Sequence, residues 1–128
     1  MPTLQKNMND KDQLINESFE ISEHIRYIAV YDDDGLVMKQ RSDITHVSSN
    51  ESDKYEEILV NPTLLKLASQ RGNIDCGGLE YFIIRYGNFF VLLIPCKKGH
   101  VNFGIEPEAN PLLLVEPVYG LLRRYRMK

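Results

Sequence analysis

The stretch Leu79–Pro95, LEYFIIRYGNFFVLLIP, decides the fold of this chain. One apolar and aromatic run precedes the pair Gly87-Asn88 and another follows it, which predicts two antiparallel strands joined by a two-residue turn. Such a turn pairs Tyr86 with Phe89. Both runs are apolar at successive positions, and successive side chains of a strand point to opposite faces of a sheet. The hairpin therefore has two faces to bury, and the sequence predicts a sheet with helices on both sides.

The same register separates the two cysteines of the chain, Cys76 and Cys96. It pairs Leu79 with Cys96 and leaves Cys76 three residue pairs away, roughly 10 Å at ~3.3 Å per residue. A disulfide requires Cα atoms within about 7 Å of each other, so we expect two reduced thiols. The sequence has no CxxC pair and no cluster of Cys and His, and we expect no zinc site.

A second strand–turn–strand unit lies upstream, where the runs 26–31 and 36–41 flank the turn sequence DDDG, Asp32–Gly35. An Asp-Gly pair between two β-like runs is a strong hairpin signal. The three aspartates could also bind a cation, but they lack the ligand spacing of a calcium loop, and we expect a solvated turn. The polar residues of 36–41 place that strand near an edge of the sheet.

A fifth strand is predicted after the turn at Gly99. Its apolar side chains alternate and are expected to face the core: Val101, Phe103 and Ile105. Asn102 and Gly104 are expected to face outward.

Helices are predicted over four ranges: 11–25, 52–60, 62–71 and 111–125. Asn61 fits a helix N-cap and Pro62 fits a first helical turn, so the central helix is expected in two pieces. Residues 1–10 are polar and without periodicity, and we expect them to form a disordered arm before a single domain, 11–128.

The resulting order, α-β-β-α-β-β-β-α, resembles that of the roadblock/LC7 family and its profilin-like relatives. The resemblance rests on the strand–Asp-Gly–strand opening, IAVYDDDGLVMKQR, and on a helix that leads through Gly77-Gly78 into the meander 79–95. It implies an α+β fold of three layers, α/β/α, with a five-stranded antiparallel sheet between the helices. The long polar loop 42–51 and the proline at position 62 depart from the family's pattern.

The resemblance also implies a function, because such proteins resemble dimeric platforms that engage small GTPases, dynein parts or membrane-signalling complexes. It implies a non-enzymatic interaction domain that forms a homodimer or heterodimer, with a small GTPase among its partners. The positions that match the dimer interface lie on the central helix and the following strand: Thr63, Leu64, Leu67, Gln70, Tyr81, Ile83 and Arg85.

Two other classes of function stay open. PAS-like ligand-sensing domains also wrap helices around a five-stranded antiparallel sheet, and they hold a small molecule in a cavity between sheet and helix. An enzyme whose site assembles from distant residues is the third class. The chain has no GxSxG, HExxH, GxGxxG or Walker motif, so we expect no catalytic residue, cofactor or metal.

Charge and hydropathy exclude further classes of partner. Residues 1–60 hold 13 acids and 6 bases, and residues 61–128 hold 5 acids and 9 bases, which gives net charges of −7 and +4. The pI of about 5.6 argues against a nucleic-acid-binding domain, although the tail carries three arginines and a lysine: Arg123, Arg124, Arg126 and Lys128. The longest apolar run, Phe89–Pro95, is far shorter than the ~20 residues of a membrane span. The N-terminus does not have the pattern of a signal peptide, and we expect a cytoplasmic protein.

Overall fold

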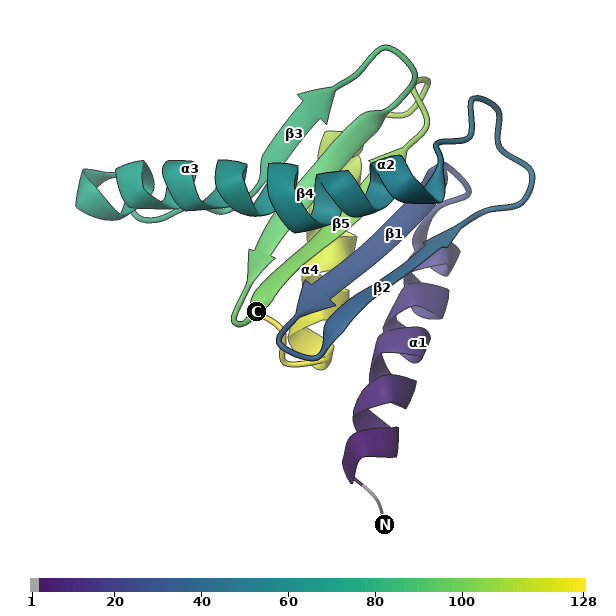
Figure 1. Ribbon diagram of the computed structural model, residues 1–128. Coiled ribbons are helices and arrows are strands. Elements are labelled where there is room, and N and C mark those ends of the chain that lie inside the picture. The colour runs from purple at the N-terminus through teal and green to yellow at the C-terminus, as the bar shows by residue number, and fades with distance from the viewer. Residues whose placement is uncertain (1–2) are drawn as a thin grey trace.

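A five-stranded antiparallel sheet forms the middle layer of the computed structural model, which describes residues 3–128 and their side chains from residue 10 onward. Its strands are β1 (Ile25–Asp32), β2 (Gly35–Gln40), β3 (Phe82–Arg85), β4 (Phe90–Cys96) and β5 (Gly99–Ile105). They lie in the order β2-β1-β5-β4-β3, so β2 and β3 are the edges (Figure 1).

Helices cover both faces of this sheet (Figure 1). One face carries α1 (Thr3–Ile21), the 3-10 helix η2 (Pro111–Leu114) and α4 (Val115–Arg124). The other carries a continuous helical segment made of α2 (Asn50–Tyr55), the π-helix η1 (Glu56–Val60) and α3 (Asn61–Asp75). The α+β fold of three layers expected from the sequence is confirmed. None of the helices in residues 3–128 is long and apolar enough to cross a bilayer.

The hairpin of β3 and β4 has the expected register. The Tyr86 N–H donates to the Phe89 carbonyl over 2.9 Å, and Phe82 lies opposite Leu93. Strand β3 begins at Phe82, three residues later than the apolar run suggested, and ends at Arg85. Val91 and Leu93 are buried on the face of α3, and Leu92 and Ile94 are buried on the opposite face, against α1 and α4.

The prediction that Asn102 and Gly104 of β5 face outward is wrong. Val101, Phe103 and Ile105 do point into the core with α1 and α4, but the Asn102 side chain on the other face is also fully buried. A Cβ on Gly104 would come within 3.0 Å of the Tyr27 side chain. Alternation along a strand tells which residues share a face, but it does not tell which face is covered. Here the helical segment 50–75 covers the face that carries Asn102 and Gly104.

The central helical segment is not interrupted at Pro62, although α3 does begin at Asn61 with the proline in its first turn, as expected. A proline inside an α-helix lacks the N–H donor, and its ring crowds the carbonyl four residues earlier. The π turn of η1 ends at Val60, two residues before this proline, and its wider spacing moves the carbonyls that the ring would otherwise crowd. Asn61 does not cap a helix, and the N-cap is Ser49, whose side chain accepts from the Ser52 N–H.

Helix α1 begins and ends earlier than expected. It starts at Thr3, so most of the segment predicted to be a disordered arm is helical, and residues 1–2 lie outside the described residues. It ends at Ile21, where the Arg41 guanidinium donates to the carbonyls of Phe19 and Ser22. These bonds satisfy carbonyls at the end of the helix, and β1 starts at Ile25. Both cysteines are free thiols, as expected.

Candidate protein-interaction surface

The helical segment 50–75 exposes a line of large apolar side chains on the side that faces away from the sheet. Their exposed fractions run from 52% to 75%, and they are Tyr55, Ile58, Leu59, Leu67 and Ile74. Steps of about four residues along a helix keep side chains on one face, and the exposed Thr63 and Gln70 fill the gaps in the series. We call these seven residues the outer stripe.

A buried carboxylate fixes which side of the segment faces the sheet. Glu57 in η1 has no exposed surface, and four side chains surround its two oxygens. Oε1 lies 2.7 Å from His100 Nε2 and accepts from Asn61 Nδ2 over 3.0 Å. Oε2 accepts from Asn102 Nδ2 over 2.6 Å and from the Tyr27 hydroxyl over 2.9 Å. A carboxylate offers about four lone-pair sites, so this one is saturated.

The electrostatics of this cluster hold the Tyr27 hydroxyl in its neutral form. Burial, followed by the negative charge of Glu57, raises the pKa of the Tyr27 hydroxyl well above its ordinary value. Tyr27 therefore stays a neutral donor. Because an unpaired buried carboxylate is strongly unfavourable, the cluster holds only while η1 stays against β1 and β5.

A second carboxylate attaches the start of the segment to β2. Asp53 accepts from Gln40 Nε2 over 2.9 Å and from the Ser48 hydroxyl over 2.6 Å. Burial is the largest influence on Asp53 and raises the pKa of its carboxyl, while these hydrogen bonds act in the opposite direction. These two attachments, together with the buried Asn61 and Leu65 further along the segment, turn the outer stripe toward solvent.

Strand β3 offers a free edge beside the same segment. It is the last strand of the sheet and pairs with β4 on one side only. Tyr86 is hydrogen-bonded to Phe89, and in an antiparallel pair every second residue turns its backbone groups away from the partner. The N–H and C=O groups of Ile83 and Arg85 therefore point outward from the sheet. Figure 1 shows α3 running past this edge.

The structure divides the interface predicted from the sequence into two groups. Thr63, Leu67 and Gln70 are exposed on α3, with Leu64 half-buried beside them. The strand group is half-buried or exposed on the opposite face of the sheet: Tyr81 and Ile83 pack against the core under α1 and α4, and the Arg85 guanidinium lies 5.0 Å from the centre of the Phe90 ring. The two groups therefore lie on opposite faces of the sheet. A single interface that includes both groups stays a prediction.

Sequence reasoning missed the N-terminal part of the outer stripe, namely Tyr55, Ile58 and Leu59, and Ile74 at its far end. The usable signal is the series of apolar residues at steps of about four, 55, 59 and 67. Apolar periodicity alone predicts a buried face, whereas the true buried face is polar, with Asp53 and Glu57.

Side chains fill the space in which a PAS-like domain would hold its ligand. Between the sheet and the helical segment lie Glu57, Asn61 and Leu65, packed on β1, β4 and β5, and each of these three residues is at most 8% exposed. This arrangement favours a filled interior over a ligand cavity at that position.

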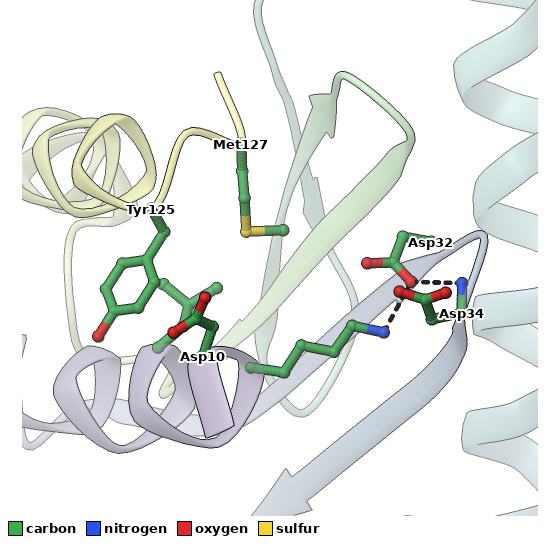
Figure 2. Close-up of a pocket in the computed structure, with 7 residues that line it drawn as sticks. Asp10, Asp32, Asp34, Tyr125 and Met127 are labelled. Atoms are coloured by element: carbon green, nitrogen blue, oxygen red, sulfur yellow. Dashed lines mark hydrogen bonds and ion pairs between the residues drawn. The ribbon is translucent and has the colours of Figure 1, made fainter. Parts of the chain in front are cut away.

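The aspartate run lies at a hairpin tip, where a lysine already binds it. Asp32 Oδ1 accepts from Lys11 Nζ over 2.6 Å and from the Asp34 N–H over 2.8 Å (Figure 2). A hollow of about 210 Å³ opens beside this pair, between α1, the hairpin tip and Met127. Among the side chains that the structure describes, no group of three or more His, Cys, Asp and Glu is placed to hold a metal ion.

The basic tail is tied to the body of the protein. The Tyr125 hydroxyl donates to Glu17 on α1, and Lys128 Nζ donates to the Pro95 carbonyl over 2.9 Å. The Lys97 N–H donates to the Met127 carbonyl over 3.0 Å. The tail thus packs beside the β4–β5 turn.

Comparison with known proteins supports the topology. No protein-family model matches the chain, and neither does any curated protein sequence. A search of solved structures finds the gliding protein MglB from Thermus thermophilus with a TM-score of 0.65 at 10% sequence identity. The match covers 92% of this chain and 89% of that one. At this identity the likeness shows the fold, and the roadblock-like topology expected from the order of elements is supported.

Proposed function

We propose that this chain is a non-enzymatic, cytoplasmic protein-interaction domain that works as a dimer and engages a further partner, with a small GTPase as the first candidate. The observation that carries the proposal is the outer stripe beside the free edge of β3. The fold likeness to MglB and the roadblock-like order of elements support it. The GTPase itself comes from the resemblance of the sequence to the roadblock/LC7 family.

The outer stripe has the properties of a surface that a partner covers. Single exposed apolar side chains are ordinary on a protein surface, but a contiguous apolar patch marks an interaction site. Here five large apolar residues share one side of a single helical segment. Covering one fully exposed Leu or Ile side chain stabilises a complex by ~1.5–3 kcal/mol, so a few of them suffice for a stable contact.

The free edge of β3 supplies the second element of the dimer. An exposed edge strand with apolar side chains readily pairs with another strand. Two copies that pair β3 with β3 about a two-fold axis would form one continuous sheet. In that arrangement the part of α3 that runs past β3 would lie over the neighbouring copy (Figure 1). The two copies of α3 would then lie side by side on the joined sheet, so that only the flank of each outer stripe would be buried in the dimer and the remainder would be left to the further partner.

Light scattering of the full chain tests the dimer directly. The unchanged protein is expected to have twice its monomer mass of 14.8 kDa, and Leu67→Glu is expected to give the monomer mass because it puts a charge into the outer stripe. Leu113→Glu is the matched control, because Leu113 is 74% exposed on η2, outside the stripe. A monomeric unchanged protein at high concentration, or equal loss of dimer in both variants, would refute the proposal.

A further inference from the structure

A cleft of about 390 Å³ lies between the start of the helical segment and the β3–β4 turn. Its walls are partly aromatic, with Tyr55 on the helix, Tyr86 at the turn and Phe89 beside it. The rings of Tyr86 and Phe89 are 5.7 Å apart between their centres. Asp53 and Glu56 add two carboxyl groups to the same lining.

Glu56 is the carboxyl group of this cleft for which the described side chains supply neither a cation nor a hydrogen-bond donor, whereas Asp53 has two donors. Among the side chains that the structure describes, no Lys, Arg or His nitrogen lies within 4 Å of its oxygens. Glu57 is saturated by its own four neighbours, and Asp53 is held by Gln40 and Ser48. Burial, and then the charges of Glu57 and Asp53, raise the pKa of Glu56 to about 7. A cation placed beside Glu56 would offset the cost of burying its charge.

The nearby positive charge of Arg26 does not serve Glu56. The Arg26 guanidinium lies over the Phe89 ring, 5.0 Å from its centre. It is paired with Glu106 over 3.0 Å and donates to the carbonyls of Thr45 and His46. Its donors are thus directed at other groups, and the cleft keeps an excess of negative charge.

We propose that this cleft receives an arginine side chain presented by a protein partner. A guanidinium is planar, so it can stack on a tyrosine ring while it donates to a carboxylate, and it is less strongly hydrated than an ammonium. The aromatic walls and the unpaired Glu56 provide both contacts within one cleft. This inference rests on the proposed function, since it describes how a partner of the interaction domain is recognised.

The position of the cleft relative to the outer stripe fits a role beside the dimer. Tyr55 belongs to both, and the cleft opens at the N-terminal end of the stripe, whereas the half of α3 that runs past β3 is at the other end (Figure 1). A partner that covers Tyr55, Ile58 and Leu59 would bring an arginine to the cleft directly.

A titration followed by amide NMR tests the site. The probe is N-acetyl-arginine methylamide at pH 8, and N-acetyl-citrulline methylamide is its neutral counterpart of almost the same shape. We expect saturable shifts of the amides of Glu56, Tyr86, Gly87 and Asn88 with the arginine probe only. Glu56→Gln is expected to weaken the binding by about tenfold or more, and Glu51→Gln, which removes an exposed charge from the same helical segment, is expected to leave it unchanged.

The outcomes separate this inference from the dimer. The titration is repeated in Leu67→Glu, and arginine binding there supports the cleft whatever mass light scattering gives. Equal shifts with the citrulline probe, no saturation, or unchanged binding in Glu56→Gln would overturn the arginine site. Shifts of the same amides on concentrating the protein without probe, lost in Leu67→Glu, would assign the cleft to a second copy of the chain and overturn the separate partner.

Discussion

Glu57 Oε1 and His100 Nε2 lie 2.7 Å apart in the fully buried layer between the helical segment 50–75 and strand β5. The contact joins two residues that are 43 positions apart in the chain. It places a hydrogen-bonded polar pair where most proteins of this size place apolar side chains. The outer stripe and the cleft at Glu56 both owe their orientation to it.

Removing the Glu57 carboxyl group should lower the free energy of unfolding far more than removing an ordinary surface carboxyl group. Glu57→Ala leaves His100, Asn102, Asn61 and Tyr27 without their common acceptor. Each buried donor left without an acceptor costs about 1–3 kcal/mol, so the loss of an acceptor shared by four side chains destabilises the fold by about 3 kcal/mol or more. We expect a loss of this size in the free energy of unfolding measured in urea, whereas Glu51→Ala, on the exposed side of α2, should change it by less than about 0.5 kcal/mol. Equal effects of the two substitutions would contradict the role of Glu57.

The neighbouring Glu56 should make stability depend on pH. Its pKa is about 7 in the folded protein against an ordinary 4.5, so the folded state binds the proton more tightly than the unfolded state. The free energy of unfolding therefore falls as pH rises from about 4.5 through 7. Glu56→Gln is expected to remove this fall in the free energy of unfolding, because glutamine does not ionise.

The measurement compares urea unfolding of the unchanged protein and Glu56→Gln at pH 5 and pH 8. Between pH 5 and pH 8, the free energy of unfolding of the variant is expected to rise relative to that of the unchanged protein. The rise is at most about 3 kcal/mol, and solvent screening makes it smaller. The difference between the two proteins isolates Glu56 from Asp53, whose pKa is also raised. If the difference in free energy of unfolding between the two proteins is the same at pH 5 and pH 8, Glu56 ionises in its ordinary range.

The edge of β3 can be blocked without disturbing the sheet inside one subunit. The N–H of Arg85 points away from β4, so Arg85→Pro removes no backbone hydrogen bond of the sheet within one subunit. It also removes the exposed guanidinium, which contacts the Phe90 ring and the carbonyls of Tyr86 and Gly87. We expect light scattering to show the monomer mass for this variant. The matched control is Met38→Pro at the other edge. Its N–H also points outward, because the neighbouring pair Arg41–Arg26 is hydrogen-bonded. Loss of the dimer in Met38→Pro, with retention in Arg85→Pro, would place the interface at β2 instead.

Gly99, at the start of β5, should not tolerate any side chain. A Cβ there would stand 1.8 Å from the Tyr31 carbonyl oxygen, and both groups belong to the backbone of the sheet. We expect Gly99→Ala to cost at least about 2 kcal/mol, since the clash cannot be relieved by rotating a side chain. Gly87→Ala is the control, because nothing lies within 4 Å of its Cβ position. Thermal unfolding of the two variants gives the comparison, and similar melting temperatures would contradict this role of Gly99.

Sequence alone predicts the parts of the fold that depend on local geometry. The two-residue turn at Gly87-Asn88 sets the register of β3 and β4 by its length, and that register is confirmed. The layer order follows from strands that are apolar on both faces. These features need no knowledge of distant residues, which is why they can be predicted directly.

The predictions that failed depend on what a distant segment supplies. Asn102 is expected outward because asparagine is usually exposed, and only the arrival of Glu57 from η1 gives its amide N–H an acceptor inside the protein. Pro62 does lie in the first turn of α3, as its fixed φ angle favours, but the π turn that joins α3 to the preceding helix has no local sequence signal. The outer stripe is hidden for a related reason: periodicity identifies an apolar face without telling whether that face meets the sheet or the solvent.

The π turn of η1 corrects the angular phase of the whole segment. Asp53, Glu57, Asn61 and Leu65 are buried at strict steps of four, yet an ordinary α-helix gains about 40° with each such step, or about 120° over three. The extra residue in the wide turn removes most of this drift, so one straight line of side chains meets the sheet and another meets the solvent. Deleting a single residue from 56–60 would rotate everything downstream by about a quarter turn or more. Leu67 and Ile74 would then leave the line that begins at Tyr55, and the continuous stripe would become two separate short patches.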